Sequence, residues 1–293
     1  MKLGIVILNF NGLEDTLECI KSIKKLNNTT ILVVDNASTD KSKEVLEKIS
    51  GVRLIINKIN LGFSGGNNVG IRYCLENKFD LMLVLNNDTL LADSTIEELL
   101  RGTKAADIIS PKIYFAKNYE FHKDRYKEKD LGKVIWYAGG NIDWQNVIGG
   151  HIGVDEVDNG QFDQAREIDF ATGAAMLVKR EVFEKIGLFD ERYFLYLEDM
   201  DFCVRAKKAG FKIMYEPKAI VWHKNAQSLG GSGSKLQDYY ITRNRLLFAF
   251  KFAKLKTKMA VFKQTLFLWQ NSVKRRALLD FLLYRFGKSS VSQ

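Results

Sequence analysis

Three carboxylates fall within four positions of the segment YLEDMDF, residues 196–202: Glu198, Asp199 and Asp201. Aromatic and aliphatic residues frame them on both sides, whereas acidic runs are usually solvated. The segment EDMDFCVRAKKAG predicts a helix that ends at Gly210, because glycine is preferred just after a helix. At about 100° per residue, Glu198 and Asp201 lie roughly 60° apart, and Asp199 points about 100° from the first and 200° from the second. The three carboxylates therefore cannot all face one ligand.

This geometry predicts different roles for the three carboxylates. Asp201 can pair with Arg205 one turn later, and both Glu198 and Asp201 suit the positive end of the helix dipole. Asp199 is left to face a pocket, where a partly apolar setting raises a carboxyl pKa and improves the group as a base. We expect Asp199 to act as a general base, with Glu198, Asp201 and Arg205 holding it. The alternative is that all three acids only cap and pair.

The first hundred residues indicate how such a site is positioned. Strand-length apolar segments at 3–9, 30–35, 52–57 and 81–88 alternate with helical periodicity near 13–23, 40–49, 68–77 and from about 94. This alternation predicts an α/β fold with a mostly parallel sheet and helices on both faces. Polar residues end three of the strands, at Asn9, at Asp35 and at Asn86-Asn87-Asp88. Ligands of such sheets bind outside the carboxyl ends of the strands, so we expect a polar ligand there.

The usual nucleotide-binding loops are missing from their expected positions. The first strand is followed by NFNGLED, which lacks the G-x-G-x-x-G of dinucleotide-binding folds, and LGGSGSK at 229–235 lacks the order of a P-loop. The glycine-rich segment NLGFSGGNNVG, residues 60–70, follows the third strand instead. Its glycines allow close backbone approach. We expect a wall of a donor pocket that includes Asn60, Gly62 and Asn67; a flexible connection is the alternative.

Five motifs occur in order over residues 2–223: VVDNASTD, NLGFSGGNNVG, LNNDT, YLEDMDF with RAKKAGF, and VWH. Together they resemble the inverting family 2 glycosyltransferases, and most of all the rhamnosyltransferase- and galactofuranosyltransferase-like branch. The resemblance implies the GT-A nucleotide-diphospho-sugar transferase fold, a nucleotide-sugar donor and a divalent metal. In the family's pattern Asp35 matches the contact to the donor's base or ribose, and Asp199 matches the catalytic base. Asp88 matches the last aspartate of the metal-binding D-x-D motif, and His223 a histidine that completes the metal site.

The metal motif departs from the family pattern, because Asn86 and Asn87 stand in its first two positions. A single carboxylate remains, so metal affinity without donor should be weak. A divalent ion can neutralise a departing diphosphate, and a site with oxygen ligands and one imidazole suits Mn²⁺ or Mg²⁺. We take Asp88 and His223 as metal ligands. The expected donor-binding residues are Asn9, Asp35, Asn60, Gly62, Asn67, Asn87 and Asp88.

Charge separates the chain into two parts. The net charge is +9, but residues 243–293 hold twelve lysines and arginines against one acid, Asp280, which leaves −2 for the rest. We therefore expect a catalytic domain over residues 1–242 and basic helices over 243–293. Seven apolar residues of the tail are spaced by four and three, which on one helix would form a single stripe flanked by lysines: Phe248, Phe252, Leu255, Met259, Phe262, Leu266 and Trp269.

The stripe predicts a helix that lies in an anionic membrane surface. A coiled-coil seam and packing on the catalytic body are the alternatives. The three cysteines form no CxxC pair, and no uncharged stretch is long enough to span a membrane. These features favour a cytoplasmic protein bound to the inner face of the cell membrane.

The function expected from the sequence is metal-dependent transfer of one sugar with inversion, in cell-surface polysaccharide synthesis. The favoured donor is dTDP-rhamnose, with a UDP-hexose or UDP-galactofuranose as runner-up. The acceptor would be a hydroxyl of a saccharide, lipid-linked by preference. A catalytically inactive carbohydrate- or nucleic-acid-binding protein is the alternative. We expect no nucleic-acid partner, because the body is net acidic and its motifs would then be unexplained.

Overall fold

The computed structural model describes residues 1–24, 26–225 and 234–289. Within them, ten strands form one mixed sheet, eight of them in the order β10-β12-β6-β11-β4-β1-β2-β3. The strands of this sheet are β1 Leu3–Asn9, β2 Thr29–Asp35, β3 Val52–Ile56, β4 Leu81–Asn86, β5 Thr89–Leu91, β6 Ile108–Phe115, β7 Ile135–Tyr137, β10 Arg166–Glu167, β11 Ala175–Lys179 and β12 Ile213–His223. A separate hairpin pairs β8 Gly140–Asp143 with β9 Ile148–His151.

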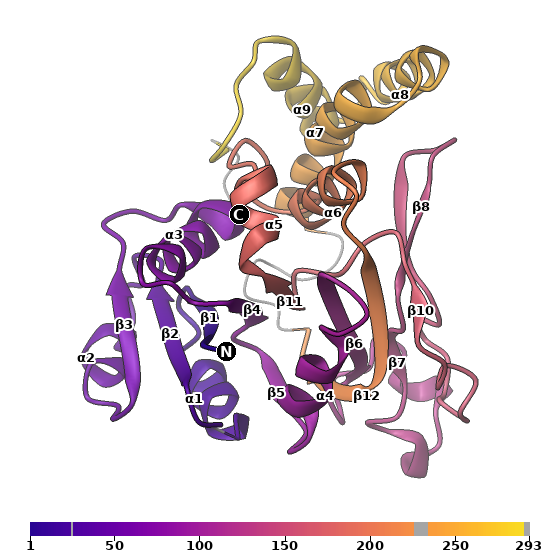
Figure 1. Ribbon diagram of the computed structural model, residues 1–293. Helices are drawn as coiled ribbons and strands as arrows, with labels where there is room; N and C mark the ends of the chain where they lie inside the picture. The colour runs from indigo at the N-terminus through magenta and orange to yellow at the C-terminus, as the bar shows by residue number, and fades with distance from the viewer. Residues whose placement is uncertain (25, 226–233, 290–293) are drawn as a thin grey trace.

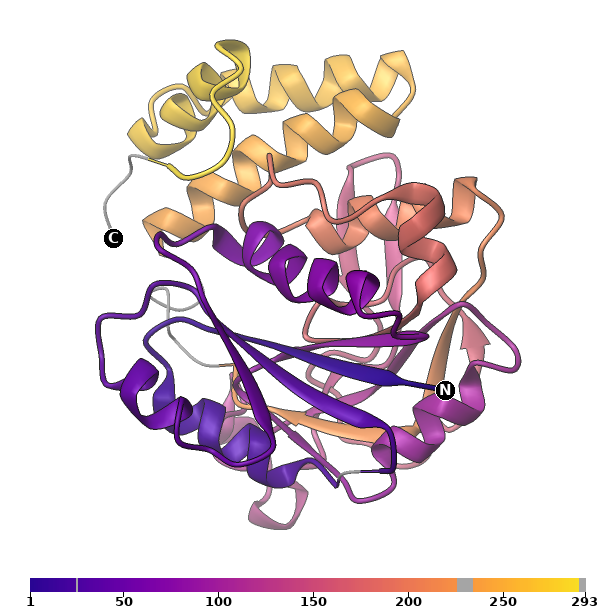
Figure 2. The same ribbon diagram turned by 60° about the vertical axis from the view of Figure 1, so that its left-hand side comes forward.

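Helices cover both faces of the sheet (Figures 1 and 2). α1 Leu13–Ser22, α2 Ser42–Leu46 and α4 Thr95–Gly102 lie on one face. α3 Gly62–Glu76, α5 Arg180–Ile186 and α6 Glu198–Lys208 lie on the other. Two short 3₁₀ helices, Lys123–Arg125 and Glu128–Asp130, lie in the connection between β6 and β7. The expected α/β fold with a largely parallel sheet is confirmed.

The parallel half of the sheet brings the polar strand ends together. β3, β2, β1 and β4 run parallel, and the register pairs Asn9 with Asp35 and Leu8 with Asn86. β11 then runs antiparallel between β4 and β6, and β12 runs parallel to β6. β4 ends at Asn86, two residues earlier than expected, so Asn87 and Asp88 lie in the turn before β5.

The expectation for the glycine-rich segment was wrong in one respect. Residues 62–70 are the first half of α3, not a loop that precedes a helix. The glycines allow this helix to lie directly on the sheet. A Cβ on Gly66 would lie 2.4 Å from Leu8 Cδ1, and one on Gly70 would lie 2.4 Å from Val6 Cγ1. Small residues show no apolar periodicity, so the sequence of residues 62–70 gave no signal for a helix.

The C-terminal segment forms three helices, α7 Lys235–Phe252, α8 Leu255–Phe267 and α9 Ser272–Leu282. They gather above α3 and α6 on one side of the molecule (Figure 2). The expected boundary between residues 242 and 243 falls inside α7, which buries Arg243 and Phe248 completely. Of the helices that the structure describes, none is both long and apolar enough to cross a membrane.

The apolar stripe is not on one helix, because α7 ends at Phe252 and Ala253 is extended. Phe248 is buried and its ring stacks on Trp144, with 5.9 Å between centroids. Phe252 and Phe262 also pack against the core. The other four members, Leu255, Met259, Leu266 and Trp269, are 40–74% exposed. Packing on the body, one of the alternatives, therefore accounts for part of the stripe only.

Candidate active site

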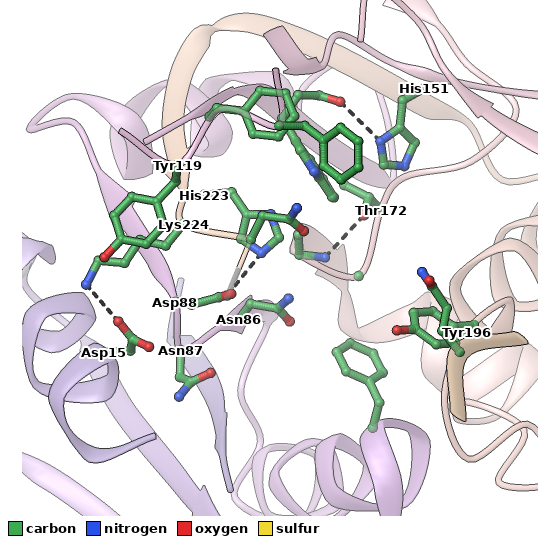
Figure 3. Close-up of a pocket in the computed structure, with 18 of the residues that line it drawn as sticks. Asp15, Asn86, Asn87, Asp88, Tyr119, His151, Thr172, Tyr196, His223 and Lys224 are labelled. Atoms are coloured by element: carbon green, nitrogen blue, oxygen red, sulfur yellow. Dashed lines mark hydrogen bonds and ion pairs between the residues drawn. The ribbon is translucent and has the colours of Figure 1, made fainter. Parts of the chain in front are cut away.

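A cavity of about 1890 Å³ opens where the parallel strands end. Leu8 of β1, the turn Asn86-Asn87-Asp88 after β4 and His223 at the end of β12 line one part of it. Glu198 and Asp199, at the start of α6, line another. In Figure 3 the Asn86–Asp88 turn and His223 lie on one side and Tyr196 lies across from them. The fold thus gathers residues more than a hundred positions apart at one cavity.

Asp88 and His223 are neighbours in this cavity (Figure 3). The Nε2 atom of His223 lies 3.0 Å from Oδ1 of Asp88. Neighbouring ligands of an octahedral ion, each about 2.1 Å from the metal, are also about 3.0 Å apart. Nδ1 of His223 is buried without a hydrogen-bond partner. The pair fits a divalent cation as two of its ligands.

Two protein ligands make an incomplete metal site. Within the described residues, no group of three or more His, Cys, Asp or Glu side chains could hold a metal ion. Mg²⁺ keeps water or substrate phosphates among its ligands when few protein groups are available. The donor set at Asp88 and His223 therefore suits an ion that arrives with a diphosphate.

Asp199 has the surroundings expected of a base. The side chain is half-buried and lines the cavity. Its Oδ2 accepts a hydrogen bond of 3.0 Å from the Gly173 N–H, and its Oδ1 one of 2.8 Å from the Met200 N–H. Burial raises the pKa of the Asp199 carboxyl, and the two N–H groups offset that increase only in part. The carboxylate is fixed by backbone donors and faces the cavity.

Glu198 and Asp201 lie on one face of the helix by spacing, but their side chains have different surroundings. Glu198 is 4% exposed and also lines the cavity, because α6 begins at this residue. Burial, and then the Asp199 charge, raise its pKa well above the usual range. Asp201 is completely buried and faces away, with Oδ2 2.7 Å from Arg205 Nε. The expected ion pair between Asp201 and Arg205 is confirmed.

Asp201 is the centre of a buried network. It accepts a hydrogen bond of 3.1 Å from the Tyr193 hydroxyl and pairs with Lys251 of α7. Arg205 also donates to the carbonyls of Ile186 and Leu188, at 2.6 and 2.8 Å. These contacts fix α6 between α5 and α7, so Asp201 and Arg205 hold the helix that carries Asp199.

The expected donor-binding residues fall into two sets. Asn60, Gly62, Asn87 and Asp88 line the cavity. Asn9, Asp35 and Asn67 are buried and are not among the lining residues. Asn9 donates to Asp35 Oδ1 at 2.9 Å, and the Ser38 N–H donates to Oδ2 at 3.1 Å. In this structure Asp35 therefore connects the ends of β1 and β2 by hydrogen bonds and does not line the cavity.

Asn36 is a lining residue that the sequence pattern did not single out. Its Oδ1 accepts from the Leu61 N–H at 3.0 Å, and its Nδ2 donates to Asn60 Oδ1 at 3.0 Å and to the Gly62 carbonyl at 3.1 Å. These bonds fix the entry to α3. The only signal for Asn36 in the sequence is its place after Asp35 at a strand end.

Aromatic residues form another part of the wall. Trp136 lines the cavity, and its ring lies at an edge to both His151 and His223, with centroids 4.5 Å apart in each case. Burial lowers the pKa of His151 to about 4, so its imidazole is neutral at neutral pH. Two aromatic residues close in sequence are not part of this wall: Tyr137 is completely buried, and Trp144 stacks on Phe248.

The charged and aromatic segment between β6 and β7 covers the cavity on its outer side. Lys117–Arg125 supply nine of the lining residues. Nearby, Lys224 reaches from the end of β12 to Asp15 and Glu18 of α1, with Nζ–oxygen distances of 2.7 and 2.9 Å. The cavity thus has a polar part at the strand ends and a mixed aromatic and charged part next to it, where Tyr119 lies beside Lys224 (Figure 3).

The fold is the GT-A fold of glycosyltransferases, with the cavity at the ends of its parallel strands. The sequence model described as glycosyl transferase family 2 matches residues 4–187. The chain therefore belongs to family 2 of the glycosyltransferases, as the resemblance implied, and it is a glycosyltransferase. Asp199 and His223 lie beyond the matched residues.

Curated relatives agree with this assignment. A low-salt glycan biosynthesis hexosyltransferase of Haloferax volcanii is 28% identical, over 84% of this chain and 74% of the relative. The N-acetylglucosaminyl-diphospho-decaprenol L-rhamnosyltransferase of Mycobacterium tuberculosis is 27% identical, over 69% and 68%. The dTDP-rhamnosyl transferase of Shigella flexneri is 26% identical, over 83% and 78%.

Solved structures share the fold. GalNAc-T7 with UDP, GalNAc and Mn²⁺ has a TM-score of 0.61 at 16% identity; the match covers 84% of this chain and about half, 51%, of that one. A mannosyltransferase of Pyrobaculum calidifontis in complex with GDP-Man and Mn²⁺ has a TM-score of 0.54 at 12% identity, covering 97% and 86%. Both were solved with Mn²⁺, so a divalent metal is compatible with this architecture.

Proposed function

We propose that this chain transfers a single sugar with inversion from a nucleotide-sugar to a hydroxyl of a saccharide, in a metal-dependent reaction. The observation that carries the proposal is the sharing of one cavity by Asp199 and the pair of Asp88 and His223. The donor's diphosphate would lie at Asp88 and His223, and the ion bound there would supply Lewis-acid neutralisation of the leaving group. Asn60, Gly62 and Asn87 would contact the rest of the donor.

Asp199 would take the proton of the acceptor hydroxyl as that oxygen attacks the anomeric carbon. A single displacement on the face opposite the leaving diphosphate inverts the configuration. Burial and the Asp199 charge raise the pKa of the neighbouring Glu198, which disfavours a second negative charge beside the base. Trp136 and the segment 117–125 form the wall where the acceptor saccharide would bind.

For the donor we propose dTDP-rhamnose first, with a UDP-hexose or UDP-galactofuranose as alternatives. The names of the rhamnosyltransferase relatives support this order, and one of them names a diphospho-decaprenol acceptor. A lipid-linked saccharide in cell-surface polysaccharide synthesis is therefore our proposed acceptor. The alternative, an inactive carbohydrate- or nucleic-acid-binding protein, does not account for the arrangement of Asp88, His223 and Asp199 in one cavity.

The proposal is tested by donor screening followed by product analysis. Thermal-shift measurements with Mn²⁺ should show the largest stabilisation with dTDP-rhamnose among nucleotide-sugars, since a ligand that binds only the folded state raises its stability. Transfer to a diphospholipid-linked N-acetylglucosamine should then give a product of inverted anomeric configuration. Retention of configuration, or hydrolysis with no transfer to any saccharide, would contradict the proposal.

We also propose that the C-terminal helices bind the inner face of an anionic membrane. Large apolar side chains are exposed along α8 and after α9, and the most exposed are Leu255 at 74%, Phe267 at 74% and Tyr284 at 84%. Lys254, Lys256 and Lys263 are exposed on the same segment. Apolar residues bordered by cations suit a lipid interface, where each basic residue near an anionic surface adds roughly 1 kcal/mol.

Point variants test this better than truncation near residue 245, which would remove the buried Leu246 and Phe248. The double variant Leu255→Glu/Phe267→Glu is expected to lose sedimentation with anionic vesicles at low salt. Ile56→Glu/Ile59→Glu, on exposed apolar residues far from α8, changes the charge equally and should still sediment. High salt should release part of the unaltered protein. Equal sedimentation of both double variants would place the binding surface elsewhere.

A further inference from the structure

The segment that leads into α6 has an unusual backbone. Phe194, Tyr196 and Leu197 have φ values of 63°, 67° and 68°. Residues with bulky side chains rarely adopt this left-handed region, and they keep it only where surrounding contacts impose it. Phe194, Leu195 and Tyr196 all line the cavity. The strained turn, residues 193–197, is therefore part of the site wall.

Two adjacent side chains of α7 hold this turn from behind. Asn244 Nδ2 lies within hydrogen-bond distance of the carbonyls of Tyr193, Leu195 and Tyr196, at 2.9, 2.7 and 2.9 Å. Arg243 Nη2 donates to the carbonyls of Arg192 and Tyr193, at 3.1 and 3.0 Å. Both side chains are completely buried. Side-chain donors thus lie at four carbonyls of this segment, those of Arg192, Tyr193, Leu195 and Tyr196. Two of these carbonyls, Arg192 and Tyr193, also accept from backbone N–H groups.

The opposite side of the turn contacts both halves of the site. The Phe194 carbonyl accepts from the N–H groups of Phe63 and Ser64 at the start of α3, at 2.7 and 3.3 Å. Gly62 fits only because it lacks a side chain, since a Cβ there would lie 2.5 Å from the Phe194 carbonyl oxygen. At the other end, the Leu197 carbonyl accepts from Asp201 N at 3.0 Å and begins the hydrogen bonding of α6. The turn therefore connects the donor wall to the helix that begins one residue before Asp199.

We propose that Arg243 and Asn244 are positioning residues of the glycosyl transfer. They fix the turn 193–197, and through it they set the place of Asp199 relative to the donor wall at Gly62 and Phe63. This inference rests on the proposed role of Asp199 as base. It makes α7 a part of the catalytic machinery, although α7 lies outside the residues 4–187 that match the family.

The test compares Asn244→Leu with Leu278→Ala. Leucine is close to asparagine in size but donates no hydrogen bond, and Leu278 of α9 is equally buried without any hydrogen bond to the turn. kcat is measured per donor-binding site, so that unfolded molecules do not count. Asn244→Leu is expected to lower kcat at least about tenfold more than it lowers donor affinity, because misplacing a reacting group by about 1 Å can cost up to roughly 10²-fold. Leu278→Ala should lower the melting temperature and leave kcat per site unchanged.

Arg243→Lys is measured in the same way in case Asn244→Leu does not fold, because lysine keeps the buried charge but cannot reach both carbonyls. If neither variant lowers kcat per site more than Leu278→Ala does, Arg243 and Asn244 are structural and the proposal is wrong. Asp199→Asn separates this outcome from failure of the proposed function. An inactive Asp199→Asn beside a fully active Asn244→Leu rejects the positioning role alone, whereas an active Asp199→Asn rejects the base itself.

Discussion

Replacing Asp199 by asparagine is expected to lower turnover by at least about 10²-fold, the usual scale for loss of a general base. Asparagine matches aspartate in size but has one acceptor oxygen, so it keeps only one of the two hydrogen bonds from the Gly173 and Met200 N–H groups. The other contacts of the helix, including the ion pair between Asp201 and Arg205, do not involve the replaced group. Donor affinity should therefore stay near that of the unaltered protein. Steady-state transfer and a separate calorimetric titration with the nucleotide-sugar measure the two quantities.

Glu198→Gln is the matched control, because Glu198 is the neighbouring carboxyl in the same cavity and glutamine keeps its size but cannot act as a base. We expect this variant to keep most of the turnover. A large loss of turnover in Glu198→Gln together with near-normal turnover in Asp199→Asn would show that Glu198 is the base and that the assignment to Asp199 is wrong.

The pH dependence of transfer follows from the same assignment. A base must be ionised, and the raised pKa of Asp199 moves its ionisation above the value near 4 of an ordinary aspartate. The rate should therefore rise with pH, with a midpoint above about 4, and fall as the pH drops through that midpoint. The Asp199 charge in turn raises the pKa values of Glu198 and Cys203 on the same helix and of Tyr137 of β7. Because Glu198 and Asp199 interact, the midpoint belongs to the pair.

The parallel half of the sheet was predictable because its determinants are local. Each of β1 to β4 is a mostly apolar segment of strand length that ends at or next to a polar residue, and parallel pairing then brings those polar residues to one edge. The start of α6 was predictable for the same reason, since Asp201 and Arg205 are one turn apart. Burial of Asp35 behind the wall was not, because it depends on the distant amide of Asn9.

Features set by distant contacts gave little signal in the sequence. The left-handed turn 193–197 has the composition of an ordinary aromatic strand, and its conformation is imposed by Arg243 and Asn244 some fifty residues later. The helix break at Ala253 contains no glycine or proline, and the apolar spacing continues across it. The apolar periodicity of the basic tail therefore predicted a single surface helix. In the structure, the part of the tail that belongs to α7 is packed in the core.

The C-terminal helices differ in their surroundings, because α7 packs on the wall of the cavity and α8 carries exposed apolar side chains. Tyr240 of α7 stacks on Phe194 of the turn, with ring centroids 5.4 Å apart, while Leu255 and Phe267 of α8 are exposed. If α8 lies on lipid as we propose, the wall of the cavity rests on the element that contacts the membrane. A lipid-linked acceptor would then reach Asp199 without the enzyme needing a spanning segment.

Removal of divalent metal is expected to abolish transfer, and Mn²⁺ or Mg²⁺ should restore it. Metal stabilisation of a departing phosphate is worth several kcal/mol, and about 3 kcal/mol already corresponds to roughly 10²-fold in rate. Asp88 and His223, with 3.0 Å between Oδ1 and Nε2, are the two protein ligands that we propose for the ion. Asp88→Ala and His223→Ala should each weaken the dependence of nucleoside diphosphate binding on Mn²⁺, measured by calorimetry with and without the ion.

His151→Gln is the control for these variants, since it removes another buried imidazole of the same cavity that is not paired with a carboxylate. It should keep the full effect of Mn²⁺ on nucleotide binding. Because Asp88 is the only carboxylate among Asn86, Asn87 and Asp88, Mn²⁺ without nucleotide should bind weakly, and the diphosphate should raise its affinity. Full transfer in the presence of a chelator, or tight Mn²⁺ binding that survives both alanine substitutions, would show that the ion is not held by Asp88 and His223.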